Sequence, residues 1–589
     1  MTATTHAHQP PADPAKHRAE RWFRVAVTAL LLLHAGLAFD AARRLSVTHD
    51  EYWHLPIGLL NLKTGRFDFD IKNPPLTRMW AALPLLVTAN SGPREITTDD
   101  TRYGDEFVRA NPHSFERWFL LGRGMNILLS LATGLLLAVW AWEWFGTAAA
   151  LATLAVWTVS PTILGNAALV TPDLGLVLTF TASWYAVWKF AQHPTWRRAL
   201  CLGLLLGVAQ GTKFTAVVLL PLSVPAWFCA WRLWGFMLVP TRRLLLQWAL
   251  IVGTTLVAWN ACYLFQGTGA PLSTYQFGSH SLQRFNTAPP WLRAMPILLP
   301  RAYLEGLDRQ KSIMESLHPV YLDGQWQEHG FREYFVLALW YKAPHAVQAL
   351  FALGVLFVVW PGREPRLWGK LLFVLTPGVT VFAISSLSDM QLGLRYVLPV
   401  IPGLILVAGQ SARWLAWRKY KIRSLLILIS LLALPLQVRC HPDELAYFNE
   451  AAGGTTGGRA HLLDSNLDWG QGLSALREIL KKHQVQNVGL AYFGTPSPEA
   501  YGIRYRLPPR RFPRPGWYAV SVNLLENRPY NVRLPVGTYQ GVNVSEPRDR
   551  YGDFGYFKFF KPIEHAGASI EVYHLTEADV RRWRNAMGR

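Results

Sequence analysis

Charged residues are scarce in this sequence. Asp, Glu, Lys and Arg make up 16% of the 589 residues, whereas a typical soluble domain contains about 25%. Apolar residues account for 51% of the chain, and 26 residues are tryptophan. This composition excludes an ordinary soluble globular protein and predicts a membrane protein.

Cysteine is also rare, with only four residues, Cys201, Cys229, Cys262 and Cys440. They are scattered without the short spacings of a metal site, and three of them lie in or next to apolar runs. We therefore interpret them as small hydrophobic residues and expect no disulfide framework.

Several catalytic signatures are absent from the sequence. It contains no GxxxxGK[ST], HExxH or GxSxG motif. ATP-driven transport and the zinc or serine hydrolase chemistries therefore lack support. The net charge of +20 does not indicate a nucleic-acid partner, because Lys and Arg punctuate the apolar runs instead of clustering on one segment.

Apolar runs are what the sequence has in abundance. A helix needs roughly 20 such residues to cross a bilayer, and this length predicts about eleven spans. We expect them near residues 23–42, 118–142, 147–164, 171–191, 198–211, 214–234, 244–265, 344–360, 368–386, 396–413 and 423–439. The fold class that we predict is a polytopic α-helical membrane protein.

The basic residues orient these spans. Arg197, Arg198, Arg242, Arg243 and Lys421 lie in short loops that fall on one side of the membrane, which the positive-inside rule makes cytoplasmic. Residues 1–22 then form a cytoplasmic tail and residues 23–440 a transmembrane domain. Its long loops 43–117 and 266–343 lie outside, as does everything after residue 440.

Residues 441–589 are predicted to form a small α/β domain on the outer side. RAHLLDSN (459–466), NVGLAYFG (487–494), GWYAVSVN (516–523) and SIEVYHL (569–575) have the pattern of buried strands, and GQGLSALREILKKH (470–483) that of an amphipathic helix.

The first long loop contains an unusual acidic pair. Asp50 and Glu51 begin DEYWHLPIGLLNLKTG, an apolar helical pattern that we expect to lie in the membrane interface. On a helix, Asp50 and His54 share one face. One acid is explained by capping of the helix, but two acids with a histidine favour catalysis by Asp50 and Glu51, with His54 binding substrate.

Four basic residues lie at predicted outer ends of helices, Lys72, Lys213, Lys342 and Arg395. A single such cation usually reaches to lipid headgroups, but four of them on the side that should be depleted of positive charge favour an anionic phosphate ligand. Asp173 and Tyr396 are further substrate-binding candidates, although an acid after Pro172 is also ordinary chemistry for the start of a helix.

A turn in the C-terminal domain, LLDSNLDWGQGL, holds five further candidates. They are Asp464, Asn466, Asp468, Trp469 and Gln471. Turns at the carboxyl ends of strands are frequent ligand sites, and a capped turn explains the same residues equally well.

Together these motifs resemble a known superfamily. The acidic pair, DIKNPPL (70–76), TPD (171–173), GTKFTA (211–216) and GLRYVLPVIP (393–402) occur in the order found in the GT-C superfamily of lipid-carrier-dependent glycosyltransferases. The resemblance spans residues 22–440 and is greatest to the protein O-mannosyltransferases and the aminoarabinose transferases (glycosyltransferase family 39).

The resemblance implies a bacterial inner-membrane enzyme that transfers a sugar from a polyprenyl-phosphate donor to an acceptor at the periplasmic face, usually with inversion. It implies that Asp50 is the base or a ligand of a divalent metal, and that Lys213, Arg395 and Lys72 hold the departing phosphate. Membrane lipids are further partners. The sugar, the acceptor (protein, lipid or glycan) and the metal requirement stay open.

The chain departs from the family at one motif. Mannosyltransferases carry a histidine before the double proline, where this chain has Asn73 after Lys72. An alternative function is a transporter or flippase of an anionic lipid or polyprenyl-linked sugar. Such a protein should have paired halves and ionisable residues at the bilayer midplane, whereas this chain gathers its acids in the outer loops.

Overall fold

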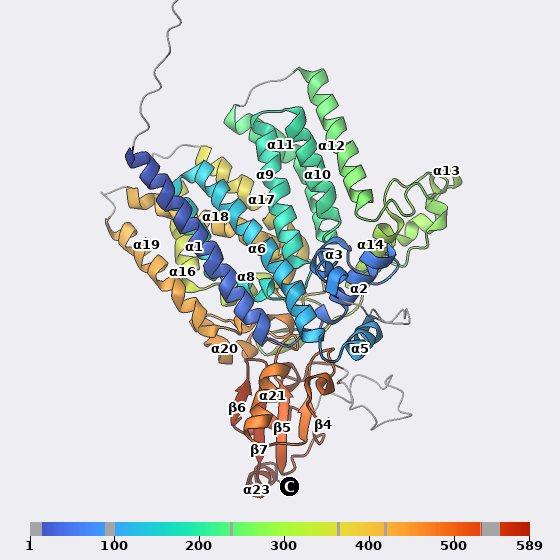
Figure 1. Ribbon diagram of the computed structural model, residues 1–589, viewed down its shortest axis with the longest axis vertical. Coiled ribbons are helices and arrows are strands. Elements are labelled where there is room, and N and C mark those ends of the chain that lie inside the picture. The colour runs from blue at the N-terminus through green and yellow to red at the C-terminus, as the bar shows by residue number, and fades with distance from the viewer. Residues whose placement is uncertain are drawn as a thin grey trace, which may run out of the picture.

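The structure is a computed structural model, and it describes residues 14–88, 100–235, 240–361, 366–416, 421–530, 532 and 554–588. The predicted cytoplasmic tail therefore lies largely outside the described residues. A bundle of long helices forms most of the molecule, and a small sheet with flanking helices lies at one end of it (Figure 1).

The bundle confirms the prediction of a polytopic helical membrane protein. Its helices are α1 (Pro14–Arg44), α6 (Phe115–Phe145), α7 (Thr147–Val159), α8 (Pro161–Ala167), α9 (Asp173–Gln192), α10 (Trp196–Gln210), α11 (Leu219–Trp234), α12 (Thr241–Ala261), α15 (Tyr334–Lys342), α16 (His345–Val359), α17 (Arg366–Ser386), α18 (Ile401–Gln410) and α19 (Lys421–Ala433). Three-residue-per-turn segments extend several of them: η1 (Phe214–Val218), η4 (Leu394–Val400), η5 (Ser411–Ala416) and η6 (Leu434–Cys440).

Seven helices in the described part of the chain are long and apolar enough to span a membrane, or up to nine if two bent pairs each count as one span. The pairs α7–α8 and α15–α16 bend by 58° and 110°. Ser160 and Ala343 lie at the bends in extended conformation, because the proline that follows each disfavours a helical conformation for the preceding residue. The two other predicted spans form α9 and α10, and α10 has only 15 residues, fewer than a bilayer requires.

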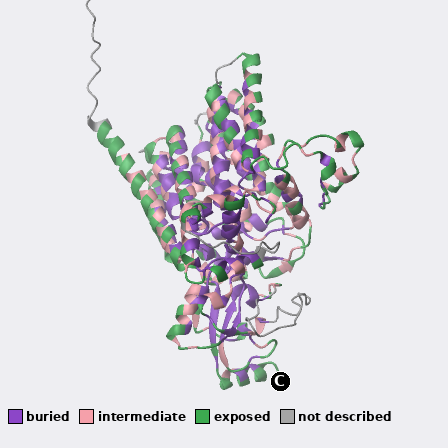
Figure 2. Ribbon diagram, turned by 45° about the vertical axis from the view of Figure 1, so that its right-hand side comes forward, coloured by how far each residue is buried: buried purple, intermediate pink, exposed green. Residues whose placement is uncertain are grey.

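The outer faces of the bundle are apolar and exposed. Leu32 and Leu33 on α1, Leu128 on α6 and Leu425 on α19 are each at least 46% exposed. Figure 2 shows this exposed surface surrounding a buried interior. Isolated apolar residues on a surface are ordinary, but such continuous rows indicate contact with lipid.

The first long loop folds into short helices beside the bundle, α2 (Glu51–Thr64), α3 (Leu76–Ala82), α4 (Leu85–Thr88) and α5 (Asp100–Ala110). The expected helix after Asp50 is present and ends at Gly65, whose φ of 64° is accessible to glycine without strain. It is not an exposed interfacial helix. Most of α2 is buried, because α3 and α5 pack on it.

The second long loop lies between α12 and α15. It contains η2 (Leu272–Thr274), η3 (Gln283–Thr287), α13 (Pro290–Arg293), α14 (Arg301–Met314) and the hairpin of β1 (Val320–Leu322) with β2 (Gln325–Gln327). Tyr303 on α14 packs on Phe214 and Trp259. These contacts fix α14 beside the start of α11.

The C-terminal region forms a five-stranded sheet of order β4-β3-β5-β7-β6. The strands are β3 (Val488–Ala491), β4 (Tyr505–Arg506), β5 (Gly516–Ser521), β6 (Glu564–Ala566) and β7 (Ile570–Leu575), with α20 (Gly454–Gly457), α21 (Leu473–Lys482), α22 (Val522–Leu525) and α23 (Glu577–Ala586) around them. β3, β4 and β5 are parallel, whereas β7 is antiparallel to β5 and to β6.

Three of the four predicted strands and the predicted helix are present, but the prediction of a strand over residues 459–466 was wrong. This segment instead forms the turns η9 (Gly458–Ala460) and η10 (Asp464–Asn466). The reason is tertiary. Asp464 has a φ of 60°, and the next two residues contact the bundle: Ser465 Oγ donates to Leu392 O, and Asn466 Oδ1 accepts from Leu394 N.

The C-terminal region is joined to the first loop by backbone pairing. Ser46 N donates to Gln471 O at 3.1 Å, and His49 N donates to Trp469 O at 2.8 Å. Gly393, just before Arg395, has a φ of 150°, and a Cβ there would collide with the Ser465 side chain. The residues around Asp50 are therefore held between the bundle and the C-terminal region.

Candidate active site

A cavity of about 540 Å³ lies where the bundle, the first loop and the C-terminal region meet. Half of the predicted site residues line it. Its polar lining comprises His49, Asp50, Lys72, Asn73, Lys213, Gln310, Lys311, Arg395, Tyr396, Asp464 and Arg528. A single space thus brings together residues from three regions that are distant in the sequence.

Asp50 and Arg395 form an ion pair in this cavity. Arg395 Nη1 donates to Asp50 Oδ2 at 2.9 Å, and the two side chains are only 14% and 16% exposed. Burial by itself would raise the pKa of Asp50, but the charge and hydrogen bond of Arg395 together with the neighbouring His49 and His54 outweigh it, and the pKa lies below its usual value. Asp50 is therefore an ionised carboxylate at neutral pH.

The Asp50 side chain does not cap the described first turn of α2, although its residue occupies the N-cap position. The capping explanation for this acid therefore loses its support. Asp50 instead points to the opposite side of the cavity, where η4 presents Arg395.

Lys213 and Asp173 form a second ion pair beside the first, with Lys213 Nζ donating to Asp173 Oδ1 at 2.6 Å. Lys213 lines the cavity, whereas Asp173 lies behind it at the start of α9 with its side chain fully buried. Lys213 and Arg395 both lie over the ring of Tyr396, at 5.3 and 5.2 Å from its centroid. Two cations therefore flank one aromatic ring at the cavity surface.

Lys72 supplies a third cation. Its side chain is 34% exposed in the cavity lining, and Nζ lies 3.7 Å from Asp70 Oδ1. Asp70 is buried and also accepts from Arg78 Nη1 at 2.8 Å. Lys72 therefore adds a positive charge to the cavity lining beside the Asp70–Arg78 pair.

Glu51 does not reach this cavity. It is fully buried and accepts hydrogen bonds from Arg123 Nε and Nη2, at 2.9 and 2.8 Å. Thr48 and the Val170 backbone N–H also donate to it. All of its acceptor capacity holds the first loop to α6 and α9, so we revise its expected catalytic role to a structural one.

His54 also lies outside the cavity. It is buried, and its Nδ1 has no hydrogen-bond partner among the described residues. Burial lowers its pKa to about 4, so the ring is neutral. Its expected contact with substrate is therefore not supported by its position.

Lys342 is buried between the bundle and the C-terminal region. Its Nζ donates to the backbone oxygens of Leu445 and Asn466, at 2.7 and 2.6 Å. Asn466 in turn accepts from the Leu394 backbone N–H at 2.9 Å. Both expected ligand-binding residues thus join the two regions next to Arg395, and neither lines the cavity.

The C-terminal turn divides into two sets. Asp464 and Trp469 line the cavity, and Arg395 lies over the Trp469 ring at 4.3 Å. Asp468 and Gln471 are buried in the turn itself, where Asp468 accepts from Gly470 N and Gln471 from Trp469 N. Two of the five candidates therefore line the cavity, and Asp468 and Gln471 hold the turn together; a ligand of this motif stays a prediction.

Sequence reasoning missed several lining residues, namely His49, Trp53, Phe493, Arg528 and Tyr530. Aromatic residues are so frequent in this chain that nothing marks these four rings. The buried Arg123 was also missed, although an arginine inside a predicted span is itself a signal of a functional or structural partner.

The acids of the cavity do not fit a metal ion. Asp50 and Asp464, and Asp173 behind the cavity, are each already held by a cation. Within the described residues, no group of three or more His, Cys, Asp or Glu side chains is placed to hold a metal. The donor set therefore suits phosphate binding by cations better than metal binding by carboxylates.

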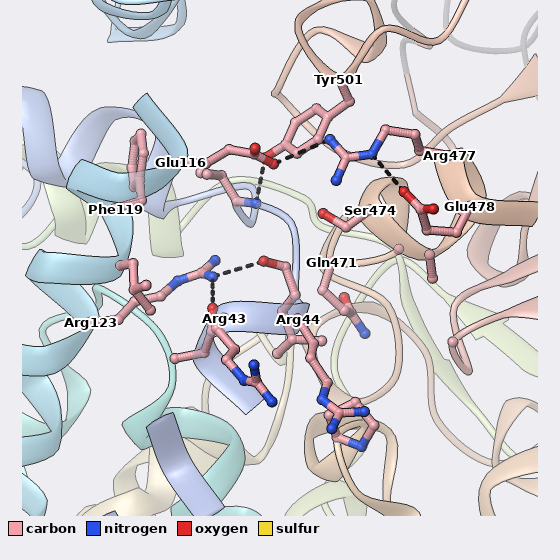
Figure 3. A pocket seen from close by; sticks show the side chains of 18 of the residues that line it. Arg43, Arg44, Glu116, Phe119, Arg123, Gln471, Ser474, Arg477, Glu478 and Tyr501 are labelled. Carbon is pink, nitrogen blue, oxygen red and sulfur yellow. Dashed lines mark hydrogen bonds and ion pairs between the residues drawn. The ribbon is translucent and has the colours of Figure 1, made fainter. Parts of the chain in front are cut away.

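A second cavity of about 600 Å³ lies behind the segment 45–49, between α1, α6 and α21. Figure 3 shows Arg477 in it, between Glu116 and Glu478 at 3.7 and 3.2 Å. Arg123 is likewise engaged by Glu51 and by backbone oxygens. Because Asp50, Lys72, Lys213 and Arg395 line the first cavity and none of them lines this one, we assign the catalytic candidates to the first cavity.

Sequence comparison identifies a family for part of the bundle. Residues 120–259 match the model of the dolichyl-phosphate-mannose-protein mannosyltransferases. The matched segment runs from α6 to α12 and includes Asp173 and Lys213. The resemblance to the mannosyltransferases is thereby confirmed over these residues. No curated protein shows significant sequence similarity to the chain.

Solved structures that are similar to the chain include the following three. ArnT from Cupriavidus metallidurans in the apo state has 18% identity and a TM-score of 0.40, covering 72% of this chain and 66% of that one. The same protein bound to undecaprenyl phosphate has 14% identity and a TM-score of 0.43, covering 85% and 93%. The S. cerevisiae Pmt1-Pmt2 complex bound to its sugar donor has 11% identity and a TM-score of 0.45, covering 71% and 89%.

Proposed function

We propose that the chain is a membrane glycosyltransferase that transfers a sugar from a polyprenyl-phosphate donor to an acceptor hydroxyl. The observation that carries this proposal is that the carboxylate of Asp50 shares one cavity with the cations Lys72, Lys213 and Arg395. The family match to mannosyltransferases over residues 120–259 supports the same reaction class.

The reaction needs two groups that the cavity provides. Asp50 accepts the proton of the acceptor hydroxyl while the oxygen of that hydroxyl attacks the anomeric carbon. The bond between that carbon and the phosphate oxygen breaks, and the polyprenyl phosphate leaves with the bonding electrons. Attack from the face opposite the phosphate inverts the anomeric configuration.

The cations stabilise the negative charge that grows on the departing phosphate. Arg395 and Lys213 flank Tyr396, and both are mostly buried, so their charges act in a water-poor space where they count for most. When Arg395 turns to the phosphate, Asp50 loses the partner that lowers its pKa and becomes a stronger base.

The same cavity has an apolar side for a lipid tail. Val217 and Val218 on η1, Met314 on α14, and Val381 and Ile384 on α17 line it. All of these residues except Met314 lie in the candidate membrane spans Phe214–Trp234 and Arg366–Ser386. A polyprenyl chain could therefore pass from the cations into the lipid phase without crossing a polar surface.

We further propose that the cavity faces the exterior of a bacterial inner membrane. The loops with Arg197, Arg198, Arg242 and Arg243 would be cytoplasmic by the positive-inside rule, and the C-terminal region would be periplasmic. Reporter fusions after Met587 and after His193 test this orientation. Cytoplasmic activity of the fusion after Met587 would contradict it.

The activity is tested with membranes from cells that lack or overproduce the protein. Labelled polyprenyl-phosphate mannose and aminoarabinose are supplied as donors, and the label is followed into protein, lipid and glycan fractions. We expect transfer to one fraction with release of polyprenyl phosphate. Movement of the intact donor across the bilayer without its cleavage would instead indicate a flippase.

A further inference from the structure

Five aromatic rings line the cavity on the side of the C-terminal region, and the proposed reaction uses none of them. We name His49, Trp53, Trp469, Phe493 and Tyr530 the aromatic cluster. Two of its members belong to the first loop and three to the C-terminal region. The family match ends at residue 259, so it does not cover these three.

Four of the rings, His49, Trp53, Phe493 and Tyr530, are in contact with one another. His49 is stacked on Phe493 with centroids 6.0 Å apart, and Phe493 lies 4.5 Å from Tyr530. Trp53 meets His49 edge-on at 5.1 Å. Thr495 and the His49 Nδ1 are hydrogen bonded at 2.7 Å, which fixes the imidazole ring.

Charged groups border these rings. Asp464 and Arg528 form an ion pair, and both line the cavity. Arg528 lies over the Phe493 ring at 5.3 Å, and its buried Nε has no partner in the described part of the chain. Asp50, Asp464, Arg395 and Arg528 line the same cavity as His49, so the proposed base, one phosphate cation and the Asp464–Arg528 pair share one space with these rings.

This combination matches the chemistry of a sugar. Aromatic faces pack against the apolar C–H face of a pyranose, and a carboxylate with a guanidinium hydrogen-bonds its hydroxyls strongly. A sugar on a phosphate held by Arg395 would extend toward Trp469, because Arg395 lies on that ring. The acceptor must instead approach Asp50 from the remaining open side.

We infer that the C-terminal region supplies a subsite for the transferred sugar of the donor, in which the aromatic cluster stacks on the ring and Asp464 with Arg528 binds its hydroxyls. This inference rests on the proposed function. It assigns donor selection to a part of the chain beyond the matched segment, while the bundle retains phosphate and lipid binding.

Binding of two probes to the full-length protein in nanodiscs tests the subsite. One probe is polyprenyl phosphate, and the other is the same lipid carrying mannose, glucose or aminoarabinose. We expect Tyr530→Ala and Asp464→Asn each to weaken binding of the preferred glycosylated probe at least tenfold and to leave binding of polyprenyl phosphate within twofold. Lys558→Gln, an exposed change in the same region, is the matched control.

The outcomes separate this inference from the proposed function. Equal losses for both probes would show that the variants only disturb the junction, and unchanged binding of the glycosylated probe would show that the cluster contacts no sugar; either overturns the subsite. A wild-type protein that binds neither probe would overturn the proposed function itself. Thermal unfolding of each variant confirms that it is folded.

Discussion

Asp50 and Arg395 are separated by 345 positions in the sequence, yet their side chains meet at 2.9 Å in one cavity. This pair places a carboxylate and a guanidinium where an attacking hydroxyl and a leaving phosphate would lie side by side. The pair is a resting arrangement in our account, because the phosphate competes with Asp50 for Arg395.

Arg395→Gln should lower the rate of sugar transfer about 100-fold or more, since it removes a preorganised charge from a water-poor site. Arg395→Lys should restore only part of the rate, because lysine lacks the forked geometry that can contact phosphate and Asp50 together. Kinetics at saturating donor measure both effects. Full activity of the glutamine variant would contradict the assigned role.

Lys213→Met should weaken binding of polyprenyl phosphate roughly tenfold or more, the cost of a charge-assisted hydrogen bond. It should also destabilise the protein, because Asp173 is then buried without its cation. Adding Asp173→Asn should recover the thermal stability but not the binding. Recovery of binding in the double variant would mean that Lys213 has only a structural role.

Glu51→Gln should destabilise the fold by about 3–5 kcal/mol, the usual cost of removing one partner of a buried ion pair, because Arg123 remains buried. Whatever folded protein survives should retain most of its specific activity. The half-life of activity at raised temperature measures the first effect. A stable but inactive variant would return Glu51 to the catalytic candidates.

Asp468 should make stability depend on pH. Burial raises its pKa to about 7 from an ordinary 3.8, so the folded state favours the protonated acid. Its contribution to stability is therefore greatest below about pH 4, falls as the pH rises toward 7 and is constant above that.

Asp468→Asn should remove this pH dependence of stability, because an amide does not titrate in this range. Thermal midpoints of the full-length protein between pH 4 and pH 8 test it, with the slope of the wild type compared with that of the variant. Parallel slopes would show that Asp468 does not titrate in this range.

Local motifs located much of the cavity in advance. Asp50, Lys72, Lys213, Arg395 and Tyr396 were all selected from short patterns at predicted ends of helices, and all line one space. The topology of a helical membrane protein brings such ends together. The position of each motif relative to the predicted spans was therefore sufficient to place these five residues in one region.

Adjacent residues were harder to separate. Glu51 follows Asp50, but each helical residue turns about 100° from the last, and Glu51 points to Arg123, 72 positions away. Lys342 looked like the other cations, but its partners are backbone oxygens in the C-terminal region. No local pattern reports such distant partners.

Local sequence patterns could not predict the aromatic cluster for the same reason. Its members come from residues 49–53 and 469–530, and only the pairing of Ser46 and His49 with the C-terminal turn brings them together. The apolar residues before the turn over residues 464–466 have the pattern of a buried strand. They are buried by tertiary contacts instead.

Transfer and binding measured together on Asp50→Asn test the central claim most directly. The purified variant is compared with the wild type for sugar transfer from a polyprenyl-phosphate donor and for binding of that donor, with Asp68→Asn, an exposed acid of the same loop, as control. A lost general base should cost about 100-fold to 10,000-fold in transfer while donor binding is retained. Transfer at the wild-type rate by the Asp50 variant would contradict the account.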